Sequence, residues 1–481
     1  MMTNQQTPLS RPTYDRAILK PRLFHIGFGA FAKAHIAVFH DEMLRQTGCD
    51  WGVVVSRLNS GADELTVLDD ADHLFTVGEM ADENLNLRQV GAIIKTLHPR
   101  RDGVEALLKQ IADPDLHVIT LTITEKGYCL ASGHLDLKNS AIVGDLANST
   151  APKSAIGLIV EGLRRRKAAG LPGITILSCD NLPTNGKLCG IAVLEFAKQV
   201  NPDLKSWISA ECRFPSSMVD RITPAMTDEA YGKLEIALGS PDTNGVLCEP
   251  FRQWVVEDNF AGEKPAWDVA GATFVGDVEP YEDLKLRLLN GSHSFLAYLG
   301  ALAGKETIAD CMADETLKKA AKKLMLEEQA LTLDVPDGFD VAEYASELIE
   351  RFCNSALKHK TTQIASDGSQ KLPQRLLAPI RTHLASGRDW SLAAFAVAGW
   401  MLYCRGTSET GALLPLNDPM AARISEIVST SDGDDYVRNM MHLGTIFGND
   451  LSSYPQFSDA VIAAYQSLKS NGVQRSLADC L

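Results

Sequence analysis

The sequence of 481 residues predicts an α/β domain with a doubly wound parallel sheet, followed by a predominantly α-helical domain. Three observations predict this fold class. Short buried strands alternate with helical segments in the first half of the chain, a glycine-rich turn joins the first strand to the first helix, and the pattern becomes helical in the second half. A boundary placed within "FVGDVEPYEDL" gives domains of residues 1–277 and 278–481.

The first half of the chain supplies the strands. Residues 23–26 form a short apolar strand, and the residues from about 31 onward repeat at helical spacing. "WGVVVSRL" (51–58) predicts a second buried strand, and 117–124 and 173–179 predict two more, with a helix over 156–170 between them. This alternation predicts a parallel sheet with helices on both faces.

The second half supplies helices. Apolar spacing predicts them over 284–303, 315–331, 341–359, 374–386, 391–405, 418–430 and 458–470. We expect the functional site in a cleft between the two domains.

The composition limits the kinds of partner. The chain is 45% hydrophobic and carries a net charge of −15, from 61 acidic and 46 basic residues. An acidic surface argues against nucleic acid or an anionic membrane, but allows a local basic pocket for an anionic small molecule. The oligomeric state stays open, a monomer included.

The ten cysteines are scattered singly, without a CxxC pair or a histidine cluster, so we expect no zinc or other metal site. The opening "MMTNQQTPLSRPTYDR" lacks an apolar signal core, and no apolar run approaches the roughly 20 residues of a membrane helix. We therefore expect a cytoplasmic protein with reduced thiols.

The glycine turn "GFGAFA" fits a variant of the dinucleotide fingerprint. Gly27 permits the tight turn, Gly29 lets a pyrophosphate approach the backbone amides, and the small Ala32 lets the helix and the strand pack closely. Ala30 and Phe31, within the turn, are further candidates for cofactor binding. Its place between a strand and a helix favours a Rossmann-like, cofactor-binding turn over an ordinary strand–helix connection. The second strand ends in Arg57 rather than a carboxylate, and an arginine there suits a 2′-phosphate, so spacing alone leaves NAD and NADP open.

The helix "KLRLLNGSHSFLAYLG" (285–300) contains three polar residues in an apolar run. On an α-helical wheel with Lys285 at zero, His293 falls at about 80° and Asn290 at about 140°. Lys285 then points into the apolar stripe, where desolvation disfavours its charge and makes it a candidate general base. The alternatives are a lysine that reaches solvent along its stem, a turn at Asn-Gly and a capping histidine.

A second polar cluster, "SCDNLPTNG" (178–186), follows a buried strand at the edge where α/β folds bind ligands. Asn181 could donate an amide hydrogen bond to an oxygen that becomes negative. A loop cap or Asx-turn is the alternative.

Several motifs together resemble the long-chain, zinc-independent mannitol dehydrogenase family. They are the glycine turn with His35, "TITEKGY" (122–128), "SCDN" (178–181), "MVDRITP" (218–224), "CEPFRQWVVEDNF" (248–260) and the K-x4-N-x2-H of 285–293. The resemblance implies reversible hydride transfer between a nicotinamide, NAD with NADP left open, and a ketose-type carbonyl. It also implies Lys285 as acid/base, Asn181 and Asn290 as oxyanion donors, His293 as a substrate-orienting residue and Asp220 as a substrate ligand.

Within the family, "TAPKSAIG", "EPFRQW" and "DGSQKLPQRLL" (367–377) resemble the branch that reduces fructuronate to mannonate rather than the mannitol 2-dehydrogenases. This implies a sugar acid as substrate; a mannitol- or arabinitol-type polyol is the alternative. A cation paired with the acid's carboxylate would add affinity and discrimination. Lys371 is the first choice, Arg252 and Arg375 are further candidates, and Arg287 lies away from the catalytic face of the wheel.

The chain also departs from the family pattern. Where the family shows "FHRAH", it has "FAKAH", so Lys33 could face a phosphate only as a point charge. Gln363 stands where the mannitol branch has a basic residue, which disfavours a pure polyol enzyme. A nucleotide-binding regulatory protein without turnover is disfavoured because Lys285, Asn181, Asn290 and His293 are all present.

Overall fold

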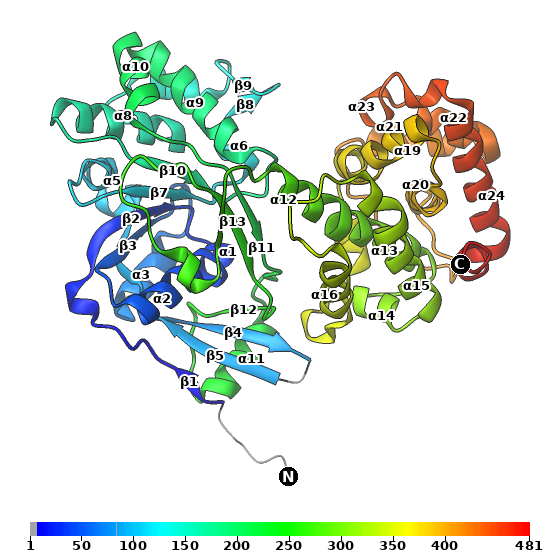
Figure 1. The fold of residues 1–481 in the computed structure, drawn as a ribbon, viewed down its shortest axis with the longest axis horizontal. Coiled ribbons are helices and arrows are strands. Elements are labelled where there is room, and N and C mark those ends of the chain that lie inside the picture. Colours follow the sequence, from blue (N-terminus) through cyan, green and yellow to red (C-terminus); the bar gives the residue numbers. More distant parts are fainter. Residues whose placement is uncertain (1–6, 83) are drawn as a thin grey trace. The chain divides into compact units, whose positions relative to one another are not determined.

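The computed structural model describes residues 7–82 and 84–481, which divide into two compact units, Met1–Glu279 and Pro280–Leu481 (Figure 1). The first unit is built on a parallel sheet and the second is helical, which confirms the predicted fold class. Each unit is described by itself.

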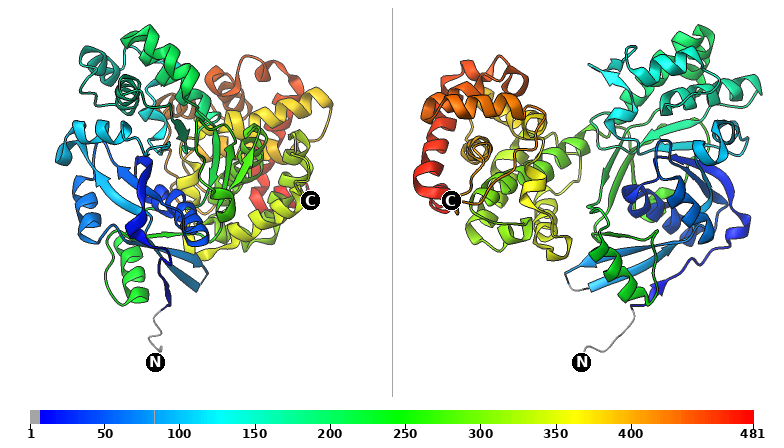
Figure 2. Two further views of the ribbon diagram at one scale, coloured as in Figure 1. Left: turned by 60° about the vertical axis from the view of Figure 1, so that its left-hand side comes forward. Right: turned by 180° about the vertical axis from the view of Figure 1, so that it is seen from behind.

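A five-stranded parallel sheet forms the centre of the N-terminal unit (Figure 2). Its order is β10 (Thr175–Ser178), β7 (Val118–Leu121), β2 (Lys20–Ile26), β3 (Trp51–Ser56), β6 (Ile93–Leu97). The strands predicted near 23, 51, 117 and 173 are the first four of these in space. The order of the strands reverses between β2 and β7, and α/β sheets bind ligands at the carboxyl ends of strands at such a point.

Alternating strand residues send apolar side chains to opposite faces of this sheet. Leu23, Val53 and Val55 pack on one face with α2 (Ile36–Thr47) and α3 (Ala62–Asp70). Neighbouring residues, among them Phe24, Ile26, Val54 and Ile119, pack on the other face. That second core includes α5 (Val104–Ile111), α8 (Ala155–Ala168) and α9 (Asn185–Val200). Burial on both faces explains why these strands are continuous apolar runs in the sequence.

Smaller sheets complete the N-terminal unit. Their strands are β1 (Leu9–Ser10), β5 (Asn84–Val90), β4 (Phe75–Ala81) and β12 (Val246–Cys248) in one sheet, β11 (Ser217–Asp220), β13 (Gln253–Glu257) and β14 (Thr273–Val275) in the second, and β8 (Leu130–Ala131) and β9 (His134–Leu135) in the third. The remaining helices of the unit are α1 (Ala30–Ala34), α4 (Pro99–Asp102), α6 (Thr124–Gly127), α7 (Ser140–Ala147), α10 (Pro202–Glu211) and α11 (Asp228–Leu238), with short 3-10 turns η1 (Arg16–Ile18) and η2 (Trp267–Ala270).

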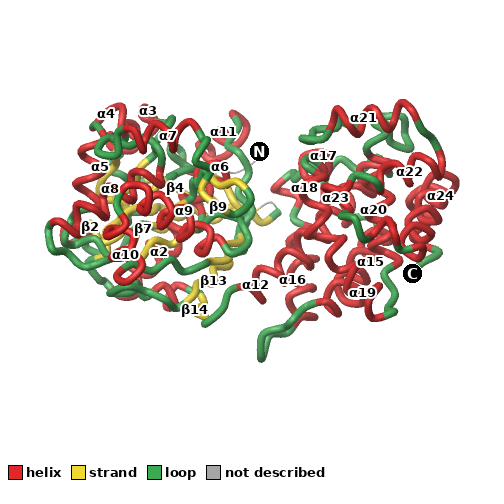
Figure 3. The backbone as a smooth tube through the Cα atoms, turned by 90° about the horizontal axis from the view of Figure 1, so that it is seen from above, coloured by secondary structure: helices red, strands yellow, loops and turns green. Residues whose placement is uncertain are grey.

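The C-terminal unit consists of helices and their connections (Figure 3). They are α12 (Glu279–Leu284), η3 (Lys285–Gly291), α13 (Ser292–Leu302), α14 (Ile308–Met312), α15 (Glu315–Lys323), η4 (Leu324–Gln329), η5 (Ala330–Thr332), α16 (Val341–Cys353), η6 (Ser355–Leu357), α17 (Thr361–Ala365), α18 (Gly368–Leu372), η7 (Pro373–Leu377), α19 (Ala378–Ser386), α20 (Ser391–Tyr403), α21 (Ala421–Thr430), α22 (Gly433–Met441), α23 (Gly444–Phe447), η8 (Leu451–Ser453) and α24 (Pro455–Ala478).

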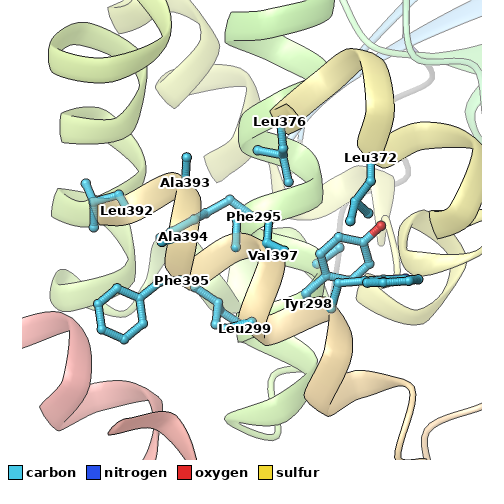
Figure 4. Packing of buried hydrophobic residues seen from close by; sticks show 14 of the residues in the cluster. Phe295, Tyr298, Leu299, Leu372, Leu376, Leu392, Ala393, Ala394, Phe395 and Val397 are labelled. Atoms are coloured by element: carbon cyan, nitrogen blue, oxygen red, sulfur yellow. The ribbon is translucent and has the colours of Figure 1, made fainter. Parts of the chain in front are cut away.

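Helices α13 and α20 form the centre of this unit, and both are buried on nearly every side. Figure 4 shows Phe295 and Leu299 of α13 against Val397 of α20, with Leu372 and Leu376 closing over them. A helix buried all round carries no polar stripe, so its sequence shows little amphipathic period.

Three π-helices, η3, η4 and η7, interrupt the C-terminal unit, and η3 packs against both of the others. The wheel used above assumed an α-helix from residue 285, and this was wrong for Lys285–Gly291. In a π-helix the hydrogen bonds join residue i to i+5, which brings Lys285 and Asn290 nearer to one face than α-helical spacing does. The Asn-Gly pair lies within the helix and not in a turn.

All ten cysteines are free thiols. Seven of them are buried, Cys49 and Cys480 are half-buried, and Cys353 is exposed. Across residues 7–82 and 84–481, no helix combines the length and the apolar character needed to cross a membrane. The same residues contain no group of three or more His, Cys, Asp or Glu side chains arranged to hold a metal ion.

Candidate active site

The glycine turn lies at the carboxyl end of β2, beside β7. Gly27 has a φ of +104°, and a Cβ added there would overlap the carbonyl oxygen of Thr122. The hydroxyl of Thr122 donates to the Gly27 carbonyl at 2.8 Å, and the Gly27 amide donates to the carbonyl of Ser56 at 2.8 Å. Gly29 is extended, with no atom outside the turn close to its Cβ position. Gly27 is therefore required by the turn itself, whereas Gly29 leaves open backbone that a ligand can approach.

A cleft of about 240 Å³ opens beside this turn. It is lined by Ile26, Gly27, Gly29, Arg57, Leu58, Asn59, Ser60, Thr122, Ile123, Thr124, Gly127, Lys153 and Ala155. Two cations, Arg57 and Lys153, thus share the cleft with exposed backbone, a combination that suits phosphate groups. Arg57 lies 3.7 Å from Glu64, so part of its charge is already compensated.

Three residues predicted to bind the cofactor lie around the turn but outside the cleft lining. Ala30 and Phe31 begin α1, and the Phe31 ring stacks on the His35 imidazole with centroids 4.9 Å apart. The Lys33 ammonium donates to the carbonyl of Asn244 at 2.9 Å and lies over the Phe75 ring. Burial lowers the pKa of Lys33 to about 8. The structure therefore gives Lys33 a partner within the protein, and its predicted phosphate contact stays a prediction.

The loop after β10 is fixed by a buried carboxylate that the sequence analysis did not single out. Asp180 accepts from the amides of Ile123 at 3.0 Å and Thr124 at 2.8 Å, and from the Tyr128 hydroxyl at 2.7 Å. Burial raises the pKa of Asp180 despite these donors. Asn181, the next residue, is exposed. These hydrogen bonds join the "SCDN" and "TITEKGY" motifs and hold the backbone next to Asn181. In the sequence, the only sign of this role of Asp180 is its position beside Asn181.

Two predicted substrate residues also belong to the N-terminal unit. Asp220 ends β11 and is buried, and it pairs with Gln253 at the start of β13. Arg252 directly precedes β13, and its guanidinium lies 5.0 Å from the centre of the Phe39 ring. Burial lowers the pKa of Arg252, and the nearby charges of Arg88 and Arg221 lower it further.

The C-terminal unit brings the other three catalytic candidates onto one continuous segment. Lys285 is 8% exposed and His293 5% exposed, so both are buried, and Asn290 is half-buried between them in sequence. The His293 ring contacts Phe352 with centroids 4.2 Å apart and the His359 ring edge-on at 5.4 Å. Within the described residues neither nitrogen of His293 has a hydrogen-bond partner. Burial holds the pKa of His293 well below its usual value, so the ring is neutral and has a donor and an acceptor to offer a ligand.

The segment 368–377 places two cations beside this histidine. Lys371 and Arg375 both depress the pKa of His293 through their charge. The Lys371 ammonium donates to the carbonyls of Ile364 at 3.0 Å and Ser366 at 2.5 Å. Burial, with Arg375 close by, lowers the pKa of Lys371 to about 8. His359 was not predicted as a site residue, and no motif in the sequence marked it.

Models of known protein families match both units of the chain. Residues 21–269 match the mannitol dehydrogenase Rossmann domain, and residues 277–469 match the mannitol dehydrogenase C-terminal domain. D-mannonate oxidoreductase of Escherichia coli (strain K12) is 47% identical over 99% of this chain and 99% of its own.

Two solved structures are similar in fold and sequence. Mannitol 2-dehydrogenase of Pseudomonas fluorescens, solved as a ternary complex with NAD and D-mannitol, is 36% identical with a TM-score of 0.85, over 98% of this chain and 96% of that one. A D-sorbitol dehydrogenase in substrate-free form is 32% identical with a TM-score of 0.91, over 98% and 97% of the two chains.

Proposed function

This chain belongs to the mannitol dehydrogenase family of oxidoreductases, and we propose that it catalyses D-fructuronate + NADH + H⁺ ⇌ D-mannonate + NAD⁺. The observation that carries the choice of a sugar acid is the pair of cations Lys371 and Arg375 beside His293. Within the described residues neither forms an ion pair with a carboxylate. A desolvated cation without a counter-ion favours an anionic ligand. Arg375 fits this description better than Lys371, on which the charges of Asp367 and Asp418 act. The 47% identity to D-mannonate oxidoreductase along both chains supports the same choice.

The residues of the glycine turn fit a dinucleotide. The positive φ of Gly27, the open backbone at Gly29 and the cations Arg57 and Lys153 would hold its phosphates. Bound there, the nicotinamide supplies the hydride that reduces the C5 carbonyl of fructuronate. NAD is the cofactor of the mannitol 2-dehydrogenase complex, and the compensation of Arg57 by Glu64 favours NAD over NADP here.

The side chains would manage the proton and the developing charge. Protonated Lys285 gives a proton to the carbonyl oxygen as it becomes negative, and takes it back in the oxidation direction. The amide groups of Asn181 and Asn290 donate to that oxygen, and neutral His293 bonds a neighbouring hydroxyl. Because the reaction draws on the cellular NADH pool, we place the enzyme in the cytoplasm.

The second candidate is a polyol 2-dehydrogenase that interconverts mannitol and fructose. The similarity to the D-mannitol complex favours it. Gln363 argues against it, because the mannitol branch is expected to carry a basic residue at this exposed position on α17.

The test is the oxidation of NADH and NADPH, followed by absorbance, with D-fructuronate and D-fructose offered separately. We expect rapid oxidation of NADH with D-fructuronate and formation of D-mannonate in equal amount. A preference for D-fructose would establish the polyol function instead.

A further inference from the structure

We propose that Arg375 binds the carboxylate of the substrate, through the Nε–Nη2 edge of its guanidinium. This inference rests on the proposed function, since it assigns the group that distinguishes a sugar acid from a neutral sugar. It differs from the prediction made from the motifs, which put Lys371 first.

The geometry of Arg375 divides its donors into two sets. Nη1 donates to the backbone carbonyl of Asn290 at 3.3 Å and to the Ser294 hydroxyl at 3.1 Å. Nε and Nη2 bond no group within residues 7–82 and 84–481. Neither atom is among the fully buried side-chain atoms that lack a partner, so both reach accessible space. A guanidinium edge with two parallel N–H groups is the shape that binds a carboxylate in a bidentate way.

Arg375 is also held still by its surroundings. Its backbone carbonyl accepts from Gln329 Nε2 at 3.2 Å, which ties η7 to η4, and its Nη1 contacts tie η7 to η3. Burial lowers the pKa of Arg375, with only the Tyr298 hydroxyl acting the other way. The side chain is thus an oriented cation in a desolvated place, with no carboxylate of the described chain to neutralise it. Such an orientation reduces the entropy lost when a carboxylate binds.

The position of Arg375 suits one end of a sugar acid. It bonds the backbone of Asn290, a predicted oxyanion donor, and the side chain of Ser294, the residue after His293. A substrate with its carbonyl at Asn290 and its hydroxyls at His293 therefore has its carboxylate end within the same group of side chains.

The other candidate cations are engaged elsewhere. Lys371 spends two of its three N–H donors on the carbonyls of Ile364 and Ser366. Arg287 donates to the Thr332 hydroxyl at 3.0 Å and pairs with Asp283 at 2.9 Å. The Arg252 guanidinium lies over the Phe39 ring, 5.0 Å from its centre.

The experiment compares acid and neutral ligands in five proteins: the wild type, R375Q, R375K, K371Q and the control S294A, which removes only one Nη1 contact. D-mannonate and D-mannitol are titrated calorimetrically into the full chain saturated with NADH, where no turnover occurs. In parallel, kcat/KM is measured with D-fructuronate and D-fructose, and thermal unfolding checks that each variant is folded.

We expect R375Q to weaken D-mannonate binding and lower kcat/KM for D-fructuronate on the order of 10²-fold more than for the neutral ligands. R375K should recover only part of this loss, because a point charge lacks the planar fork. S294A should change acid and neutral ligands alike.

The contrary results distinguish a failure of the Arg375 proposal from a failure of the proposed function. Equal losses for acid and neutral ligands in R375Q would reduce Arg375 to a scaffold residue, and a selective loss in K371Q alone would transfer the role to Lys371. A wild type that binds D-mannonate but does not reduce D-fructuronate would overturn the proposed function and leave the carboxylate site standing. A wild type that does not bind D-mannonate would overturn both.

Discussion

The cleft beside the glycine turn in the N-terminal unit and the polar segment 285–293 in the C-terminal unit are built from different parts of the chain. The cleft is mainly backbone: a glycine at positive φ, the carbonyl of Thr122 beside it and strand ends at the reversal of the sheet order. The polar segment presents side chains: Lys285 and Asn290 on the π-helix η3, which packs against two further π-helices, and His293 on the following α13.

The two constructions tolerate change differently. A backbone site depends on a few glycines and fails when a Cβ is added. A side-chain site depends on chemistry at single positions and on the helical geometry that orients them. Substitutions in the glycine turn should therefore affect the proposed cofactor binding, whereas substitutions in segment 285–293 should affect the proposed proton transfer and substrate orientation.

The largest effect is expected from Lys285→Met. Loss of the acid/base group should lower kcat by about 10²–10⁴-fold, while the affinity for NADH stays within error of the wild type. Steady-state rates and NADH fluorescence titration measure the two quantities. A variant that loses NADH binding and turnover together would show that Lys285 supports the fold rather than the chemistry.

A pair of glycine substitutions tests the backbone site. Gly27→Ala should lose roughly 1–3 kcal/mol of stability, because its φ of +104° and the Thr122 carbonyl both exclude a Cβ, and cofactor affinity should fall with it. Gly29→Ala should keep the stability and lose only cofactor affinity, since its backbone is extended and its surroundings are open. Denaturant unfolding and NADH titration check both; equal stability losses would mean that Gly29 is also needed for the turn.

Glu328, on the π-helix η4 that packs against η3, changes its protonation state near neutral pH. Glu328, next to Gln329 on η4, accepts from the amides of Leu392 at 2.7 Å and Ala393 at 2.8 Å, and burial raises its pKa to about 7. The folded state then keeps the proton up to about pH 7 while the unfolded chain loses it near its ordinary, lower pKa. This group's contribution to stability therefore falls as the pH rises between those two values.

Glu328→Gln should remove that dependence, on the order of 1–3 kcal/mol across the window, from a lower starting stability because one backbone amide loses its acceptor. Unfolding free energies measured from pH 4.5 to 8 in both proteins test this. Parallel pH profiles would contradict it.

The smallest effect is expected from Gly291→Ala. An added Cβ would lie 3.0 Å from Gln329 Nε2 and 3.1 Å from the Arg375 carbonyl, so η3 must shift by a few tenths of an ångström. We expect kcat to fall by about tenfold or less, with stability changed by about 1 kcal/mol.

Gly232→Ala is the matched control. Gly232 lies in α11 with open space at its Cβ, and the change should raise stability by about 0.5–1 kcal/mol without altering kcat. Equal kinetics in the two variants would remove the role of the π-helical packing.

The contrast also explains what could be predicted from the sequence. The sheet strands could be predicted because burial on both faces makes "WGVVVS" and its neighbours continuous apolar runs. The turn at Gly27 could be predicted because the GxGxxA spacing lies between a strand and a helix. The β4–β5 hairpin was missed, since "NLNLRQV" lies on a small sheet with exposed positions and carries no long apolar run.

The geometry of the polar segment 285–293 could be predicted from the sequence only in part. Lys285, Asn290 and His293 stood out because polar residues interrupt an apolar run, but π-helical geometry depends on how η4 and η7 pack against η3, and no residue spacing shows it. Arg375 was one cation among four in the sequence. Which of its nitrogens is already bonded depends on contacts with Asn290 and Ser294, which lie 85 and 81 positions away along the chain.

Hydride transfer from NADH to the carbonyl carbon of a sugar acid is tested most directly by one labelling measurement. D-fructuronate is reduced with NADH that carries deuterium at both C4 positions, and the product is examined by NMR and mass spectrometry. We expect D-mannonate with one deuterium at C5. An unlabelled product, a label on another carbon, or labelled mannitol formed only when D-fructose replaces the acid would contradict it.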